Sequence, residues 1–137
     1  MVRCEPAQPI ADGIFSTGEV AGPVGEHAMV VATGEGLVVL TGCAHPGVTS
    51  MVDRVGELSD RPVRLVMGGF HLGGAGDEHV HGVIDELRRL GVALVAPSHC
   101  TGERARELFR AEYGSAFVYS GAGRVISAEQ LPGPQGR

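Results

Sequence analysis

The pattern of apolar and polar positions changes near residue 37, where short segments give way to a strand followed by a helix. Residues 37–42, LVVLTG, are all apolar or small, which is typical of a strand buried on both faces. The next apolar residues have the spacing of one helix face: Val48, Met51, Val52, Val55 and Leu58. Pro46 precedes them, near a helix start, where its missing N–H costs least. This stretch predicts a strand and then a helix.

The same unit recurs further along the chain. Residues 63–69, VRLVMGG, predict a second buried strand. A second set of apolar residues repeats the helical spacing: Val80, Val83, Ile84, Leu87 and Leu90. Gly91 follows them, and we expect it to cap this helix.

A third unit completes the series. Residues 92–98, VALVAPS, predict a strand, and Thr101 is the expected N-cap of the helix after it. Leu108 and Phe109 form the inward face of that helix, which is expected to end at Gly114. Strands separated by helices of this length imply βαβ crossovers and a mostly parallel sheet.

Shorter strands are predicted on both sides of these units. Residues 14–20 and 28–33 read as strands, and the GEG turn after the second predicts a hairpin with residues 37–42. Residues 116–129 read as a closing hairpin around GAG. The predicted fold class is therefore α/β, with a mixed sheet that contains parallel βαβ units and three helices.

The length of 137 residues predicts a single domain, 1–137, with one hydrophobic core. We expect the ordered core to cover about residues 10–129, with flexible ends at 1–9 and 130–137. Hydrophobic residues make up 43% of the chain, yet no apolar run approaches the roughly 20 residues that span a bilayer. No signal peptide is recognisable either, so a cytoplasmic protein without a membrane partner is expected.

Charge and residue content exclude several classes of function and site. The net charge is −5, and all 11 basic residues are arginines scattered along the chain, which argues against a nucleic-acid partner. Without a lysine, neither a P-loop lysine nor a Schiff-base lysine is available. The 3 cysteines are an odd number without the spacing of a disulfide framework, which fits a reducing compartment.

Each of the three middle strands delivers a histidine at or just past its carboxyl end: His45, His71 and His99. Ligands of open α/β sheets bind at this edge, and neutral imidazole is the commonest metal ligand in proteins. We therefore predict a metal site formed by these three histidines. Cys43 and Cys100 stand close to two of them, either as thiolates that join or tune the metal or as small buried residues at tight turns.

Two other features are weaker candidates. His79 and His81 form an H-x-H pair, but at a helix start their side chains point apart, so solvated helix-face residues are the better interpretation. The glycine-rich segment 68–78 lies between a strand and a helix, as a phosphate-binding loop should, but it lacks the dinucleotide fingerprint, and a mobile loop is the better interpretation. The residues assigned to a substrate or anion loop are Gly68, Gly69, Thr101 and Gly102.

The segments TGCAHPG, GGFHL and PSHCTG occur in this order at the three strand ends. With them the chain resembles the metallo-β-lactamase-fold superfamily, and most nearly its dihydropterin-ribofuranosylaminobenzene 5'-phosphate synthase-like group. The resemblance runs from about Ile10 to about Ala128 and corresponds to the C-terminal half of the αββα sandwich. His45 and His99 match site positions of that half, with His71 as a less certain third. The metal-binding H-x-H-x-D-H segment of the N-terminal half has no counterpart in this chain.

The resemblance implies a divalent metal, most simply zinc with manganese or iron as alternatives. It also implies hydrolysis or transfer on a small-molecule substrate of the phosphate or pterin type. Because a half-sandwich leaves one sheet face uncovered, we expect a homodimer or a separately encoded N-terminal half as partner. The alternative is a catalytically inactive fragment, or a partner subunit without a functional metal site.

Overall fold

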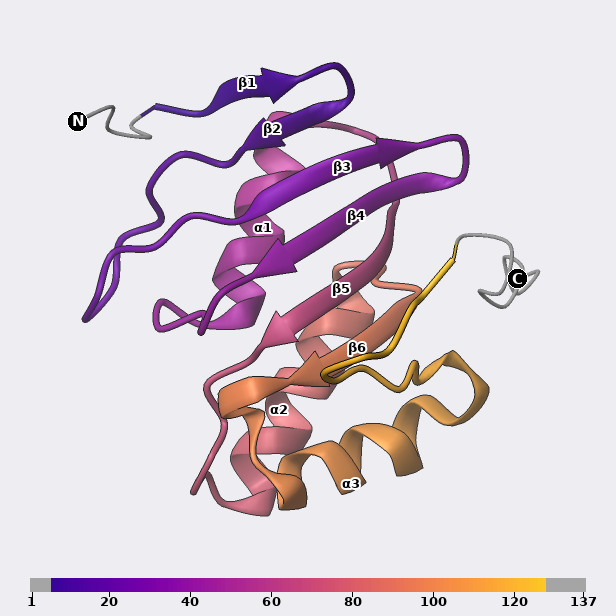
Figure 1. Cartoon of the computed structure of the whole chain (residues 1–137). Coiled ribbons are helices and arrows are strands. Elements are labelled where there is room, and N and C mark those ends of the chain that lie inside the picture. The colour runs from indigo at the N-terminus through magenta and orange to yellow at the C-terminus, as the bar shows by residue number, and fades with distance from the viewer. Residues whose placement is uncertain (1–5, 128–137) are drawn as a thin grey trace.

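The computed structural model describes residues 6–127 of the chain. A single six-stranded sheet runs through it in the order β1-β2-β3-β4-β5-β6 (Figure 1). Neighbours from β1 to β4 pair antiparallel, whereas β4, β5 and β6 pair parallel. The strands are β1 Gln8–Ala11, β2 Ile14–Ser16, β3 Met29–Thr33, β4 Gly36–Thr41, β5 Val63–Gly69 and β6 Leu94–Ser98.

Each parallel strand is followed by a helix, as the apolar spacing predicts. The helices are α1 Val48–Leu58, α2 Asp77–Arg89 and α3 Glu103–Tyr113, with short 3-10 turns η1 His99–Thr101 and η2 Gly114–Ala116. Gly91 and Gly114 end α2 and α3 with positive φ angles, and their N–H groups donate to carbonyls of the last helical turn. The α/β class, the mixed sheet and the three helices are confirmed.

All three helices pack on one face of the sheet. Alternate strand residues point toward them, and Val30, Val39, Val66 and Val95 are completely buried there. Each helix contributes buried residues to the same hydrophobic cluster, for example Met51 of α1, Ile84 of α2 and Phe109 of α3. Figure 1 shows α1 and α2 behind the strands, with α3 below β6. One core therefore holds the carboxyl ends of the parallel strands in place.

The opposite face of the sheet is also apolar but far less covered. Register places a set of side chains on it that are partly buried or exposed, which we call the open sheet face: Met29, Val31, Val38, Leu40 and Met67. Within residues 6–127, cover comes from the segment after α3, whose Ala116 and Val118 pack over Leu65, Leu94 and Ala96. The rest of the face has no helix against it in the described part of the chain (Figure 1).

Two expectations about the last third of the chain are wrong. The segment predicted as a closing hairpin contains no strand as far as residue 127; Phe117 instead makes an isolated parallel bridge to Val95. The hairpin does not form because Val118 N–H donates to Val95 O and Ser120 Oγ donates to Ala96 O, which joins the segment to β6. Residues 128 and 129 lie outside the described range.

Thr101 is the second correction, since it is not the N-cap of α3. That position belongs to Gly102, which has no side chain to accept a hydrogen bond. The hydroxyl of Thr101 is completely buried, donates to Ser98 O at 2.6 Å and accepts from Phe70 N–H at 3.1 Å. It ties the loop after β5 to the loop after β6.

The observed ends of several strands differ from the predicted ends by a few residues. β2 ends at Ser16, β6 begins at Leu94, and β1 has no counterpart among the predicted strands. Of the predicted flexible ends, residues 8 and 9 belong to β1, while 1–5 and 130–137 lie outside the described range. None of the helices in residues 6–127 is long and apolar enough to cross a membrane.

Candidate metal centre

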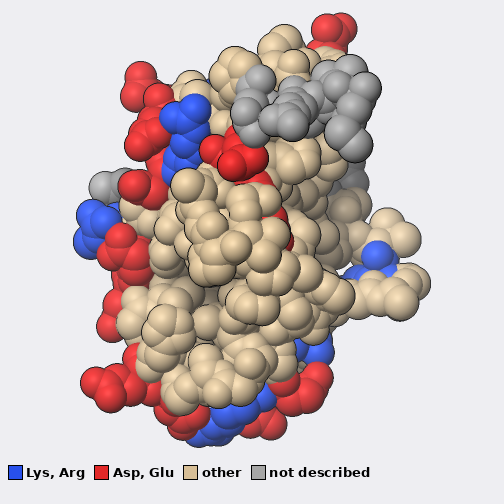
Figure 2. All heavy atoms as spheres, turned by 90° about the vertical axis from the view of Figure 1, so that its left-hand side faces the viewer, with Lys and Arg blue, Asp and Glu red and all other residues tan. Residues whose placement is uncertain are grey.

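The carboxyl ends of β4, β5 and β6 meet at one edge of the sheet, as parallel pairing requires. His45, His71 and His99 follow these strands and are brought to this common edge. Figure 2 faces the side toward which the three strands point in Figure 1. Most of its middle is uncharged, and arginine and carboxylate atoms lie mainly near the rim.

The backbone at each strand end is unusual. Ala44, His71 and His99 have φ angles of 58°, 50° and 50°, in the left-handed region that side chains disfavour. These are the non-glycine residues with positive φ among residues 6–127, and one follows each parallel strand. Such positions cost about 1–3 kcal/mol each and cluster at functional sites. The strained positions therefore mark the same edge as the histidines.

Glu26 holds His45. The carboxylate Oε1 accepts a hydrogen bond from His45 Nδ1–H, and Oε2 accepts one from Ala44 N–H at 2.8 Å. The main chain of Glu26 exchanges two hydrogen bonds with Val20, which anchors the loop between β2 and β3. Because Nδ1 is engaged, Nε2 is the nitrogen of His45 left for a metal, the arrangement usual for metal-binding histidines.

The charge of Glu26 is itself stabilised. Partial burial alone would raise the pKa of this carboxyl, but the hydrogen bonds from His45 and from the Ala44 N–H outweigh it and hold the pKa below 4.5. Sequence patterns do not point to Glu26, because it lies in an irregular loop 19 residues from its partner.

The histidines are not gathered into one compact donor set. The rings of His45 and His71 lie 4.3 Å apart between centroids, tilted by 54°. His99 is near the cysteines instead. Among residues 6–127, two donor groups have all their ligand atoms within 4.8 Å of one another: Glu26 with Cys43 and His45, and Cys43 with His99 and Cys100. Neither group contains two histidines, so a shared three-histidine ligand set stays a prediction.

The two cysteines meet across β5, at Gly69. A Cβ at this glycine would lie 2.8 Å from Cys100 Sγ and 2.5 Å from Gly42 O. The missing side chain therefore leaves the space in which Cys100 reaches the loop after β4, where its thiol donates to Cys43 O at 3.5 Å. Burial and the neighbouring Cys100 thiol raise the pKa of the Cys43 thiol. Cys43 and Cys100 therefore lie beside His99 at the carboxyl edge, and their role as neighbours of a metal stays a prediction.

The predicted anion loop has a structural role in the chain. At Gly68, with φ 125°, a Cβ would lie 2.2 Å from Thr41 O, so β5 packs closely on β4 at this point. At Gly102, with φ 81°, a Cβ would lie 2.9 Å from Gly73 Cα, in the neighbouring loop. These glycines therefore allow close packing at the carboxyl ends of the strands, where Thr101 joins the loops after β5 and β6. Binding of an anion by these residues stays a prediction.

The remaining candidates lie elsewhere. His79 is exposed on α2, and His81 Nε2 lies 4.0 Å from Glu112 Oε1 between α2 and α3. Neither belongs to a donor group in the described part of the chain, consistent with solvated helix-face residues.

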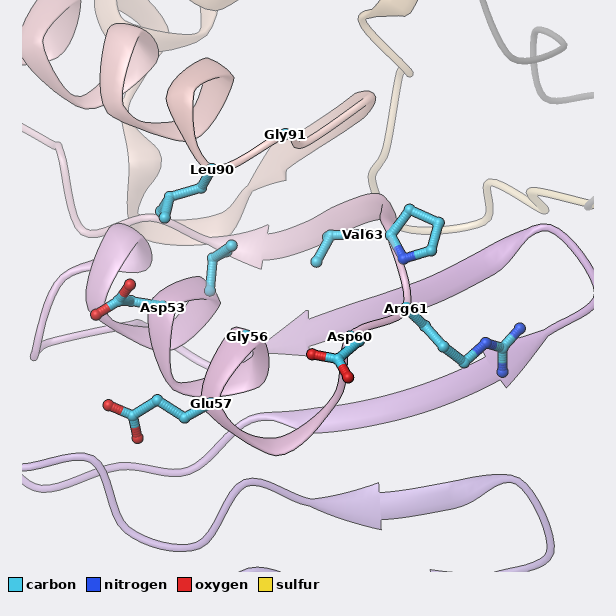
Figure 3. Close-up of a pocket in the computed structure, with 10 residues that line it drawn as sticks. Asp53, Gly56, Glu57, Asp60, Arg61, Val63, Leu90 and Gly91 are labelled. Atoms are coloured by element: carbon cyan, nitrogen blue, oxygen red, sulfur yellow. The ribbon is translucent and has the colours of Figure 1, made fainter.

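A hollow of about 460 Å³ lies at the other end of the sheet, between the end of α1, the start of β5 and the turn after α2 (Figure 3). Its volume would suit a small ligand. Its polar lining consists mainly of surface charges: Asp53, Glu57, Asp60 and Arg61. It is remote from the strand ends that carry the histidines, so the carboxyl edge is the better candidate site.

Comparison with known proteins identifies several relatives of the chain. No protein-family model matches the chain. A 7,8-dihydropterin-6-methyl-4-(β-D-ribofuranosyl)-aminobenzene-5'-phosphate synthase from Methanocaldococcus jannaschii is 37% identical over 102 residues, which is 74% of this chain and 35% of the relative. An uncharacterized protein of the same archaeon is 31% identical over 103 residues, 75% of this chain and 37% of the relative.

Among solved structures, a metal-dependent hydrolase of the β-lactamase superfamily superposes with a TM-score of 0.82 at 30% sequence identity. The superposition covers 93% of this chain and 58% of that protein. The chain therefore spans between about a third and three fifths of the relatives it matches, and its sheet and helices have the metallo-β-lactamase fold.

Proposed function

Because this chain is a metallo-β-lactamase-superfamily protein related to the dihydropterin-ribofuranosylaminobenzene phosphate synthases, we propose that it contributes a metal site to hydrolysis or transfer on a small phosphate- or pterin-type substrate. One observation carries the proposal: His45, supported by Glu26, stands beside His71 at the edge that also holds Cys43, His99 and Cys100.

The chemistry of these side chains fits a divalent metal. Imidazole and thiolate donors suit zinc best among the common ions, with manganese or iron as alternatives. His45 Nε2, His71 and His99 would hold the ion, and Glu26 would orient His45. A metal bound there would lower the pKa of a water to about 7 or polarise a phosphate oxygen.

The surroundings explain why a metal would matter for an anionic substrate. Arginines lie mainly at the rim of the carboxyl edge, and its middle is mostly uncharged (Figure 2). Since residues 6–127 place little positive charge there, a phosphate group would depend on the metal or on residues supplied by a partner.

The same proposal includes a partner, because the open sheet face exposes apolar side chains. Met29 is 37% exposed on this face, and Val31, Val38, Leu40 and Met67 are only partly buried. Exposed apolar area of this kind marks an interaction surface. Either a second copy of the chain or a separately encoded first half would cover it and bring further residues to the site, with the homodimer as the simpler arrangement.

A second candidate function is a non-catalytic partner subunit. The apolar open sheet face favours it, because exposed apolar area of this kind suits a contact with another chain. In this alternative the chain acts by binding another protein through the open sheet face, and the carboxyl edge binds metal weakly or not at all. Free thiols at Cys43 and Cys100 suit a reducing cytoplasm under either proposal.

Metal content distinguishes the two. Protein purified without chelator should contain zinc, manganese or iron in near-stoichiometric amount, and His45→Ala/His99→Ala should lose it while its circular dichroism spectrum is retained. His79→Ala/His81→Ala is the matched control, because those histidines lie on α2 away from the edge. Folded wild-type protein that stays metal-free, alone and after mixing with a first half, would reject the metal site.

A further inference from the structure

We infer that Cys43, Cys100 and His99 form a thiolate–imidazole site that binds a zinc-class ion within this chain alone, without residues from a partner. The inference deepens the proposed function, since it places the metal at the same edge, but it assigns the strongest ligands to two cysteines rather than to three histidines.

The distances between the donors carry the inference. Cys43 Sγ, Cys100 Sγ and a ring nitrogen of His99 all lie within 4.8 Å of one another. Zinc binds sulfur at about 2.3 Å and nitrogen at about 2.0 Å, so tetrahedral coordination needs donors roughly 3.5–3.8 Å apart. Small side-chain rotations would close the remaining difference. Three protein ligands leave a fourth position for water or substrate.

The local backbone is built to bring these donors together. Cys43 follows β4 and Cys100 follows β6, so the intervening β5 would normally separate them. Gly69 of β5 removes that barrier, because any Cβ there would collide with Cys100 Sγ. A glycine that leaves space for the Cys100 thiol is the second observation, independent of the donor distances.

His99 and Cys100 are adjacent in sequence, and adjacent side chains of a regular strand point to opposite faces. The φ of 50° at His99 ends that alternation, and both ligand atoms converge on Cys43. The turn is held by Thr101, whose hydroxyl bridges Ser98 O and Phe70 N–H. Such a preformed turn lowers the cost of ordering the ligands when an ion binds.

Binding would be balanced by proton release. Each cysteine enters as a thiol and binds as a thiolate, so two sulfur–metal bonds form while two protons pass to solvent. His99 binds through its neutral imidazole, so the protons counted here come from the two thiols. About two protons per ion are therefore expected at neutral pH.

Cobalt(II) titration of the reduced chain tests the inference. We expect an intense thiolate-to-cobalt band in the near ultraviolet, displaced by one equivalent of zinc. Cys43→Ser or Cys100→Ser should reduce the band, since one of the two thiolates is lost, and weaken metal binding by more than about 100-fold, because the loss of an outer-shell partner alone costs about 10- to 100-fold. His45→Ala should keep the band, and Cys4→Ser is the matched cysteine control.

A second measurement needs no variant, in case the serine variants do not fold. Zinc should protect Cys43 and Cys100 from alkylation in the wild-type chain, with Cys4 as internal reference, and about two protons should be released per ion. Equal alkylation of both thiols with and without zinc overturns the inference.

Failure of this site and failure of the proposed function give different results. Cobalt bound without the near-ultraviolet band, and lost in His45→Ala, would reject the thiolate site and leave the histidine site standing. Folded, reduced protein that binds no cobalt would also reject the thiolate site, whereas the proposed function would still be decided by metal content in the presence of a partner half.

Discussion

At the scale of single residues, the candidate centre depends on side chains that position others. Glu26 accepts hydrogen bonds from both His45 and the main chain of Ala44, which fixes the ring and its tautomer. Gly69 acts by having no side chain, because a Cβ there would collide with Cys100 Sγ and Gly42 O. Neither residue is a metal ligand in the proposed site, yet each sets the geometry of residues that are.

Glu26→Gln tests this positioning role. The amide can still contact His45 but presents no negative charge to Nδ1–H, so we expect the zinc affinity of the histidine site to fall about 10- to 100-fold when it is measured in a Cys43→Ser background, where the thiolate site is removed. Zinc competition with a chromogenic chelator measures the change. Glu19→Gln, in the same loop region, is the matched control and should leave affinity unchanged. Equal affinities with and without Glu26→Gln in that background would show that Glu26 does not orient a ligand.

Gly69→Ala tests the close approach at β5. The added methyl group would meet Gly42 O and Cys100 Sγ, so we expect a loss of about 1–3 kcal/mol in the free energy of unfolding. Urea denaturation measures it. Gly82→Ala is the control: it lies inside α2 with no heavy atom within 4 Å of the new Cβ and should add up to about 1 kcal/mol. A neutral Gly69→Ala would contradict the packing.

At the scale of elements, charged side chains at the ends of α2 and α3 help to position these two helices. Asp77 and Glu78 stand in the first turn of α2 and Arg88 and Arg89 in its last, which suits the helix dipole. Asp77 also accepts hydrogen bonds from Arg104 near the start of α3. The helices that follow β5 and β6 are thereby joined close to the site edge.

Asp77→Asn should show how this link depends on pH. The hydrogen bond from Arg104 is the main reason that the pKa of Asp77 is lowered below 3.8 in the folded state. A depressed carboxyl stabilises the fold above its unfolded pKa and loses that effect as pH falls through its folded pKa. The stability difference between wild type and variant should therefore be constant near neutrality and shrink in acid below 3.8.

Thermal unfolding at a series of pH values measures this difference. Arg104→Gln provides the control background. Without the guanidinium, the stability difference that Asp77→Asn causes should no longer change as the pH falls. A difference that grows as the solution is acidified would have the wrong sign for a lowered pKa and would contradict the link.

At the scale of the whole molecule, the two faces of the sheet are unequal. One is sealed by three helices, whereas the other is covered in part by the segment after α3 and otherwise leaves the open sheet face. An uneven sheet of this kind is expected to associate, and the proposed partner follows from this asymmetry rather than from any single residue.

Met29→Glu tests the association. Residue 29 is 37% exposed on the open sheet face, so a buried carboxylate at the interface should weaken self-association by at least about 100-fold. Leu58→Glu is closely matched, because Leu58 is also 37% exposed but lies on α1. Light scattering measures the mass. A wild-type chain that stays a stable 14.2 kDa monomer at high concentration would reject the homodimer.

The sequence by itself determined the strand and helix units and the edge on which His45, His71 and His99 gather. Periodicity and buried apolar runs are local, and parallel strands with helical crossovers leave their carboxyl ends together. The closing hairpin failed because pairing with β6 competes with pairing within the segment, which local turn residues do not reveal.

Only the tertiary structure decided which side chains meet at that edge. Glu26 reaches His45 across 19 residues of sequence, and Cys100 reaches Cys43 across 57. Such contacts depend on loop paths and on a missing Cβ at Gly69, and no periodic pattern encodes them. The strand-end histidines could be foreseen because topology alone places them, whereas the carboxylate and the paired thiols depend on packing between segments that are distant along the chain.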